Sequence, residues 1–183
     1  MTPLQSELRS LLEKAVISGR DAAEAAAEGA LKALAVDRER PTITLNEDRR
    51  QLRNALRAKQ KQLGGDFSLL VAECAYEQWH RMLFARFLAE NQLLMHPSGV
   101  SVSLEECAEL APGEGEPDEW ELAAKYAAQM LPGIFKENDP CVKLRLTHEG
   151  RSSLERIIAE LPSSVFTSDD GLGWVYQFCQ SKK

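Results

Sequence analysis

The stretch Phe67–Met95, FSLLVAECAYEQWHRMLFARFLAENQLLM, contains no glycine or proline, and its apolar residues recur at the three- and four-residue spacing of a helix. Apolar side chains cover most of the circumference of this helix, and such helices usually run through the middle of a domain. Its polar residues can pair within the helix, because Glu77 precedes Arg81 by four positions and Arg86 precedes Glu90 by four. We therefore predict a central core helix, with a docking face for a second domain as the alternative.

The composition of the whole chain is that of a globular protein with a real core. It has 183 residues, of which 44% are hydrophobic and 27% are charged, and its net charge of −6 leaves room only for a local basic patch. The N-terminus lacks the pattern of a signal peptide, and no apolar run reaches the roughly 18 residues of a membrane span. The four scattered cysteines form no C-x-x-C pair. These features predict a soluble, cytoplasmic protein without membrane contact.

The first third of the chain is expected to be helical apart from one connector. Thr2 and Pro3 have the residue types of a helix start, and an alanine-rich stretch follows. Gly19 and Gly29 leave open whether this stretch is one helix or two. Residues 37–45 are expected to be a connector, because Pro41 disfavours a helical conformation of the residue before it.

A second helix is expected from its cap at Asn46 to about Leu63, closed by Gly64-Gly65, and it is the strongly basic element of an acidic protein. Its basic residues are Arg49, Arg50, Arg53, Arg57, Lys59 and Lys61. Two interpretations stay open: long cationic side chains that cover neighbouring apolar surface, or a face that contacts DNA phosphates. No aromatic residue is interleaved, which argues against stacking on single-stranded nucleic acid.

Four more helices are expected in the second half of the chain from their N-cap residues and apolar stripes. Their approximate ranges are 103–110, 118–131, 147–161 and 168 to the C-terminus. The acidic Pro/Gly segment 111–117 is expected to be a surface loop, and the alternation at residues 142–146 is compatible with a small strand. The last stripe reaches the final residues without a stop signal, which predicts that the natural chain continues beyond Lys183.

These elements together predict a mainly α fold, an irregular multi-helix bundle with at most traces of strand. We expect an N-terminal helical arm that includes the basic helix, residues 1–63, and a helical domain built around the central helix, residues 66–183. A single continuous domain is the alternative.

The sequence offers few groups for catalysis or metal binding. It has no G-x-x-x-x-G-K phosphate loop, no G-x-G-x-x-G after a strand and no G-x-S-x-G nucleophile. Its histidines, His80, His96 and His148, fall on different predicted elements, and no H-E-x-x-H or C-x-x-C could begin a metal site. We therefore assign no catalytic, cofactor-binding or metal-binding residue, and we expect that this chain alone is not a complete enzyme.

Two phrases are more specific than composition: AYEQWHRMLFARFLAEN at Ala75–Asn91 and VFTSDDGLGWVYQFCQ at Val165–Gln180. Together with KYAAQMLPGIF at Lys125–Phe135, they resemble the N-terminal region of large adenine-specific DNA methyltransferases of restriction-modification and phage-defence systems. The resemblance covers roughly residues 31–183. In that family, a helical N-terminal segment precedes a domain that binds S-adenosylmethionine and carries an Asn-Pro-Pro-Tyr-type catalytic motif.

This chain lacks the family's catalytic motif. The nearest string, Asp139-Pro140-Cys141-Val142, has neither the second proline nor the aromatic residue that stacks on a flipped adenine. Family members also usually have an aromatic residue at the position of Cys179. The resemblance therefore implies a non-catalytic domain, which scaffolds the methyltransferase domain of a parent enzyme that uses S-adenosylmethionine.

Two partners follow from the resemblance. The basic helix would contact the backbone of double-stranded DNA through Arg49, Arg50, Arg53, Arg57, Lys59 and Lys61. The central and last helices would dock on the catalytic domain through Tyr76, Trp79, His80, Arg81, Trp174 and Tyr176. The competing hypothesis is a free-standing helical protein-interaction module, which would bind its partner through an exposed apolar patch.

Overall fold

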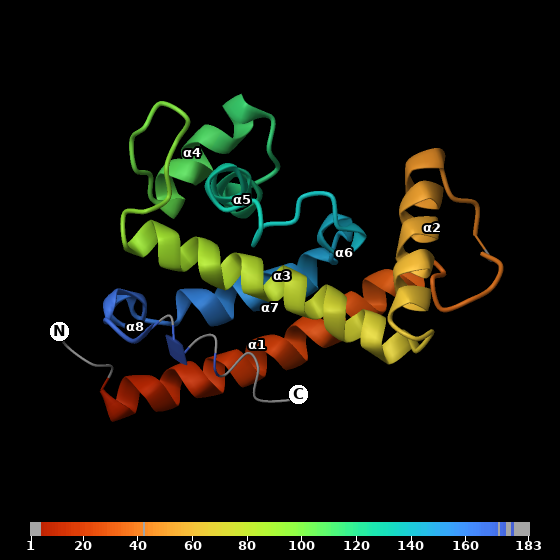
Figure 1. The fold of residues 1–183 in the computed structure, drawn as a ribbon, viewed down its shortest axis with the longest axis horizontal. Helices are drawn as coiled ribbons and strands as arrows, with labels where there is room; N and C mark the ends of the chain where they lie inside the picture. Colours follow the sequence, from red (N-terminus) through yellow and green to blue (C-terminus); the bar gives the residue numbers. More distant parts are fainter. Residues whose placement is uncertain (1–4, 42, 172, 175–176, 178–183) are drawn as a thin grey trace. The chain divides into compact units, whose positions relative to one another are not determined.

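The structure is a computed structural model that describes residues 5–41, 43–171, 173–174 and 177. Within these residues it contains eight helices and no strand, which confirms the mainly α fold class (Figure 1). The helices are α1 (Ser6–Ala33), α2 (Glu47–Gln62), α3 (Phe67–Glu90), α4 (Leu104–Glu114), α5 (Glu119–Met130), α6 (Pro140–Lys143), α7 (His148–Ala159) and α8 (Ser163–Thr167).

The chain divides into two compact units, and each unit is assembled from separate pieces of sequence. Unit 1 consists of residues 1–19, 80–137 and 155–183, and unit 2 of residues 20–79 and 138–154. Three helices, α1, α3 and α7, contribute one part to each unit. The domain boundary expected near residue 64 lies inside unit 2.

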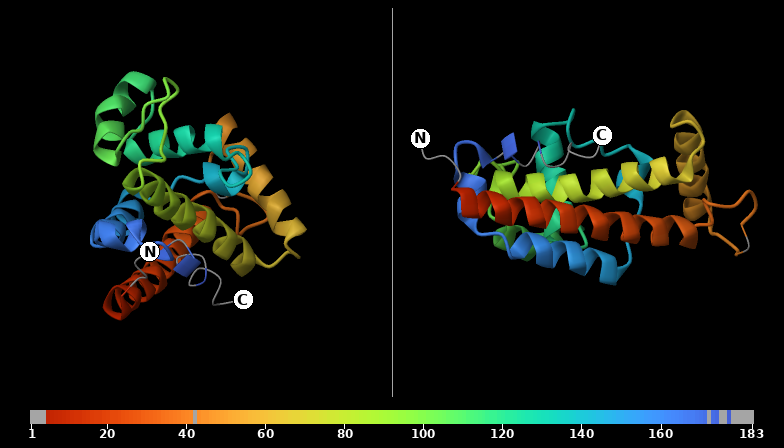
Figure 2. Two further views of the ribbon diagram at one scale, coloured as in Figure 1. Left: turned by 60° about the vertical axis from the view of Figure 1, so that its left-hand side comes forward. Right: turned by 90° about the horizontal axis from the view of Figure 1, so that it is seen from below.

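In unit 2, the second half of α1 packs closely against the beginning of α7 (Figure 2). A Cβ atom on Gly150 would lie only 2.6 Å from the Cβ of Ala26, so both positions require small side chains. The question of one or two N-terminal helices is answered as well, because α1 runs without a break past Gly19 and Gly29. Alanine predominates in this stretch, and its high helix propensity offsets the cost of the two glycines.

The basic helix α2 forms as predicted. Asn46 is its N-cap, and its Oδ1 accepts a hydrogen bond from the Arg49 amide at 2.9 Å. Gly64 and Gly65 follow the helix with positive φ values of 95° and 89°, which glycine adopts without strain.

A short helix, α6, overlaps the beginning of the segment 142–146, where a small strand was expected. The side-chain amide of Gln78 donates to the carbonyls of Cys141, Val142 and Leu144 at 3.1, 3.1 and 2.9 Å. These carbonyls therefore have a side-chain donor in place of a strand partner, and the prediction of a strand was wrong. The donor comes from a distant position in the sequence, in the first part of α3.

In unit 1, α4 packs on α5, and both begin at the predicted caps (Figure 1). The expectation that residues 111–117 form a loop was wrong for the first four of them, because α4 continues to Glu114. Ala111 is buried in this last part of the helix, and Gly115 ends it with a φ of 75°. Packing and the glycine cap outweigh the missing amide of Pro112.

The central helix α3 ends at Glu90, five residues earlier than expected. The side-chain amide of Asn91 donates to the carbonyl of Phe87 at 2.9 Å and to that of Phe166 at 3.0 Å. Gln92 then takes a positive φ of 56°, and the chain turns back through an isolated antiparallel bridge. The hydrogen bonds of the Asn91 side chain therefore accompany the end of α3, and the chain does not continue as a helix.

The end of the chain departs from the expected pattern at one point. Pro162 ends the preceding helix region as predicted, but it is followed at once by the short helix α8, which buries Val165 and Phe166. Most of the helix expected from residue 168 onward lies outside the described residues.

Candidate functional site

The six basic residues of α2 divide into internal and exposed groups. Arg53 belongs to the first, because only 6% of its surface is exposed and burial lowers its pKa. Its Nε donates to the carbonyl of Ala35 at 3.0 Å, and its Nη2 donates to the carbonyls of Arg38 and Glu39 at 2.6 and 3.1 Å. These acceptors lie in the non-helical connector after α1, whose carbonyls need donors from outside a helix.

Arg57 extends the same arrangement by one helical turn. Its Nη1 donates to the carbonyl of Val36 at 3.1 Å and to that of Arg38. The planar guanidinium presents several donors in a fixed geometry, so one side chain can satisfy several carbonyls. We name Arg53 and Arg57, together with the carbonyls of residues 35, 36, 38 and 39, the arginine clamp. It fixes the chain that follows α1 against α2.

Lys59 also has partners within unit 2. Its Nζ lies 2.7 Å from Oδ2 of Asp139 and 3.6 Å from Oε1 of Glu73. The hydrogen bond with Asp139 raises the pKa of Lys59. Burial pushes the pKa of Asp139 upward, but the hydrogen bonds from Lys59 and from the Cys141 amide outweigh it and lower the pKa. Lys59 therefore links α2 to the start of α6.

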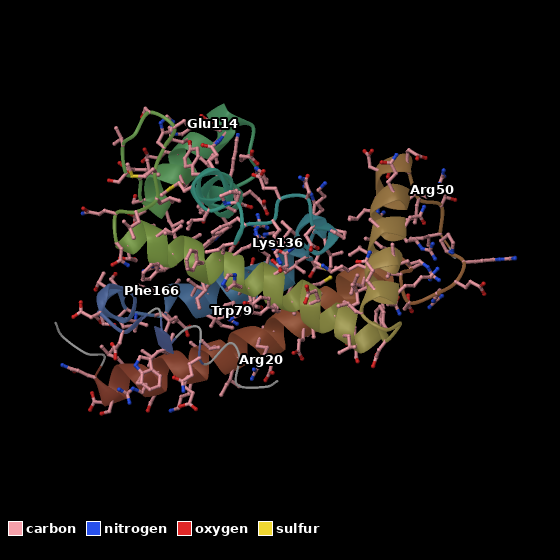
Figure 3. All side chains as sticks on the ribbon, in the orientation of Figure 1. Arg20, Arg50, Trp79, Glu114, Lys136 and Phe166 are labelled. Carbon is pink, nitrogen blue, oxygen red and sulfur yellow. The ribbon has the colours of Figure 1, made fainter. Side chains whose placement is uncertain are left out.

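The other three basic residues of α2, Arg49, Arg50 and Lys61, are exposed. Arg50, labelled in Figure 3, pairs with Glu47 at 3.0 Å, and Arg49 reaches the carbonyl of Ala33 only at 3.5 Å. Acidic and basic residues nearly balance over unit 2 as a whole. The charge available for a polyanion is therefore smaller than the sequence of α2 alone indicates.

The side chains expected to dock on a catalytic domain are mostly engaged in packing within their own unit. Trp79 is 2% exposed, in unit 2. In unit 1, the half-buried His80 ring stacks on Phe84 with centroids 5.7 Å apart, and burial, reinforced by the charge of Lys136, lowers its pKa. Arg81 lies 3.5 Å from the Glu121 carboxylate.

Three other residues were expected to dock on the catalytic domain: Tyr76, Trp174 and Tyr176. Tyr76 is half-buried. Trp174 has the guanidinium of Arg9 above its ring at 3.9 Å, and its Nε1 donates to Asp170 at 2.9 Å. Tyr176 lies outside the described residues. Within unit 1, the structure thus brings Trp174 together with α1.

Two buried cysteines in unit 2 form a contact that the sequence did not indicate. Cys74 on α3 and Cys141 on α6 are both fully buried and free, and their thiols are close enough to affect each other's ionisation. The neighbouring Cys74 thiol and burial raise the pKa of Cys141, which disfavours the reactive thiolate. The pair therefore has the properties of packing residues.

No metal centre is evident in the part of the chain that the structure describes. There, no three or more His, Cys, Asp and Glu side chains converge as a metal site would require. His96 contacts the hydroxyl of Ser98 at 2.7 Å, and His148 contacts that of Ser152 at 3.5 Å, so each has a local partner. None of the helices described is both long and apolar enough to cross a membrane.

Comparisons of the chain with protein-family models, with curated proteins and with solved structures gave no match.

Proposed function

We propose that this chain is the non-catalytic N-terminal domain of an adenine-specific DNA methyltransferase, and that it scaffolds the catalytic domain. One observation carries the proposal: the phrases that resemble this family supply much of the packed interior. Trp79, Leu83, Tyr126 and Phe166 belong to these phrases, and each is at most 2% exposed. Residues used in this way suit a domain whose task is structural.

The parent enzyme would belong to a cytoplasmic restriction-modification or phage-defence system. Its catalytic domain would bind S-adenosylmethionine, and this chain would contribute no residue to the reaction. Leu93, Val100 and Leu110 in unit 1 are 47%, 62% and 38% exposed, and they are candidates for contact with that domain.

Contact with the backbone of double-stranded DNA is the second part of the proposal, and it now rests on the exposed residues of α2 alone. Arg49, Arg50 and Lys61 are exposed, and the ion pair of Arg50 with Glu47 is a surface pair that a phosphate could displace. Arg53, Arg57 and Lys59, in contrast, are held by partners inside the fold. Phosphate contacts raise affinity without reading sequence. A weak, sequence-independent contribution to DNA binding is therefore expected.

Salt-dependent DNA binding by the whole parent enzyme tests this part. Changing Arg49, Arg50 and Lys61 together to Ala should weaken binding equally for all DNA sequences and reduce the salt slope by about 0.9 for each lost contact. Lys14→Ala, an exposed change on α1, is the matched control and should leave the slope unchanged. An unchanged slope in the triple variant would remove α2 from the DNA interface.

The family assignment is tested separately by the reading frame beyond the codon for Lys183 and by a methylation assay. A continuing frame with an Asn-Pro-Pro-Tyr-type motif, and transfer of methyl groups from S-adenosylmethionine to adenine by the full-length protein, would support it. A stop codon at that point would contradict it. The free-standing helical interaction module would then be the better hypothesis.

A further inference from the structure

The helix α4 packs closely on α5 within unit 1, but few of its own side chains are buried. Only Cys107 and Ala111 are buried among its eleven residues, whereas α5 buries seven of its twelve. The one large apolar side chain in the middle of α4, Leu110, is 38% exposed. Because hydrophobic stabilisation scales with the apolar area removed from water, the two small buried side chains of α4 contribute little of it themselves.

A second observation concerns Tyr126, a fully buried α5 residue whose ring meets that of His96 edge-on, with centroids 5.3 Å apart. Burial raises the pKa of its hydroxyl, and Glu114 and Cys107, both on α4, act on it electrostatically in the same direction. This hydroxyl has no hydrogen-bond partner in the structure. A buried polar group without a partner loses its hydrogen bond to water, and it regains that bond when the cover is lifted. Tyr126 therefore favours separation of α4 from α5.

Other features keep α4 intact as a helix without binding it firmly to α5. Ser103 and Glu106 form a complete capping box at its N-terminus. At its C-terminus, Lys125 of α5 lies 3.4 Å from Glu114 and 3.1 Å from Glu116, but these ion pairs are about one-third exposed, and water and salt weaken them. The helix is thus stable at its start and weakly held along its length.

We propose that α4 is a displaceable cover of α5, which opens as one helix while the rest of unit 1 stays folded. Opening gives the Tyr126 hydroxyl access to water and exposes the Cys107 thiol. Local openings of this kind have a lower free energy than global unfolding, and they expose less surface. The result is a conformational switch that a partner could use to reach the hidden aromatic side chain.

Alkylation with iodoacetamide at increasing urea concentrations, read for each cysteine by peptide mass spectrometry, tests the proposal. Cys107 should react in native buffer at least tenfold faster than Cys74 and Cys141, which are equally buried in unit 2. The alkylation rate of Cys107 should also change little at low urea concentrations. The dependence of such a rate on urea scales with the surface that the opening exposes, and the opening of one helix exposes little. If Cys107 shows the urea slope of the other two cysteines, α4 does not open separately and the proposal fails.

The variant Tyr126→Phe tests the cause. It removes the unpaired hydroxyl and keeps the ring, so the closed state should gain stability and alkylation of Cys107 should slow about five- to tenfold. Tyr76→Phe makes the same change in a half-buried residue of α3 and should leave the rate at Cys107 unchanged. An unchanged or faster rate in Tyr126→Phe would contradict the role of Tyr126.

Discussion

Replacing Arg53 by Ala should cost the protein a large part of its stability, although Arg53 lies on a helix whose sequence is typical of a polyanion-binding surface. The change removes donors at 3.0, 2.6 and 3.1 Å from the carbonyls of Ala35, Arg38 and Glu39. A hydrogen bond from a charged group contributes about 1.5–3 kcal/mol. The three bonds share one side chain, and residues 38 and 39 are exposed enough for water to replace part of them, so we expect a loss of about 3 kcal/mol in total.

Urea unfolding followed by far-ultraviolet circular dichroism measures this loss. Arg50→Ala is the matched control on the same helix, because Arg50 is exposed and its ion pair with Glu47 is a surface pair. It should change the free energy of unfolding by no more than about 0.5 kcal/mol. Arg53→Lys should fall between the two, since an ammonium group keeps the charge but lacks the planar array of donors.

A free energy of unfolding for Arg53→Ala within about 0.5 kcal/mol of that of the unchanged protein would refute the arginine clamp. If that variant kept its stability and lost affinity for DNA, Arg53 would return to the set of phosphate-contacting residues. Loss of both would carry no information on DNA contact, because an unfolded domain cannot present the helix. Stability must therefore be measured first.

Three other changes have defined outcomes. Gly150→Ala should lower the free energy of unfolding by about 1–3 kcal/mol, because its new Cβ would meet Ala26 at 2.6 Å. Gly29→Ala should raise the free energy of unfolding by about 0.5–1 kcal/mol, because that helical position faces open space. Equal effects of the two changes in thermal unfolding would contradict the close approach of Gly150 to Ala26. Burial lowers the pKa of His80 from 6.5, so the unfolded state binds the proton better and stability should fall as the pH drops below 6.5. Urea unfolding at several pH values should show that the free energy of unfolding of His80→Gln declines less below pH 6.5 than that of the unchanged protein. An identical decline in both proteins would exclude His80 as its cause.

Elements whose limits are set by local chemistry were predictable from the sequence. The basic helix is the clearest case, since Asn46 supplies the cap and Gly64-Gly65 supply the positive φ values that end it. The capping box of Ser103 and Glu106 likewise fixed the start of α4. In these places, a few neighbouring residues contain all the information that the backbone needs.

Limits set by distant contacts were not predictable. The end of α3 depends on Asn91, whose amide uses the carbonyl of Phe166, a residue far away in the sequence. The path of residues 138–146 depends in the same way on Gln78. Nothing in the local pattern of either segment reports such a partner. Tertiary contacts decide these positions, and periodicity alone cannot show them.

The candidate site shows the same division. The sequence identifies α2 as a cluster of positive charge, but it cannot separate Arg53 and Arg57 from Arg50. The acceptors of the arginine clamp are backbone carbonyls, which every residue has, so no complementary acidic residue marks them in the sequence. One hint was present: Leu56, three positions after Arg53 and on the same helix face, is apolar.

The anchoring of α6 has a consequence for anyone who divides or extends this chain. Judged by its prolines and glycine, the region after α5 looks like a hinge where a tag, a protease site or a circular-permutation break would be harmless. Between Asp139 and Leu144, however, Lys59 from α2 binds the carboxylate of Asp139, and Gln78 from α3 binds backbone carbonyls. An insertion there would detach α6 from both helices, whereas one at the exposed turn Pro97–Gly99 would disturb only its own short loop.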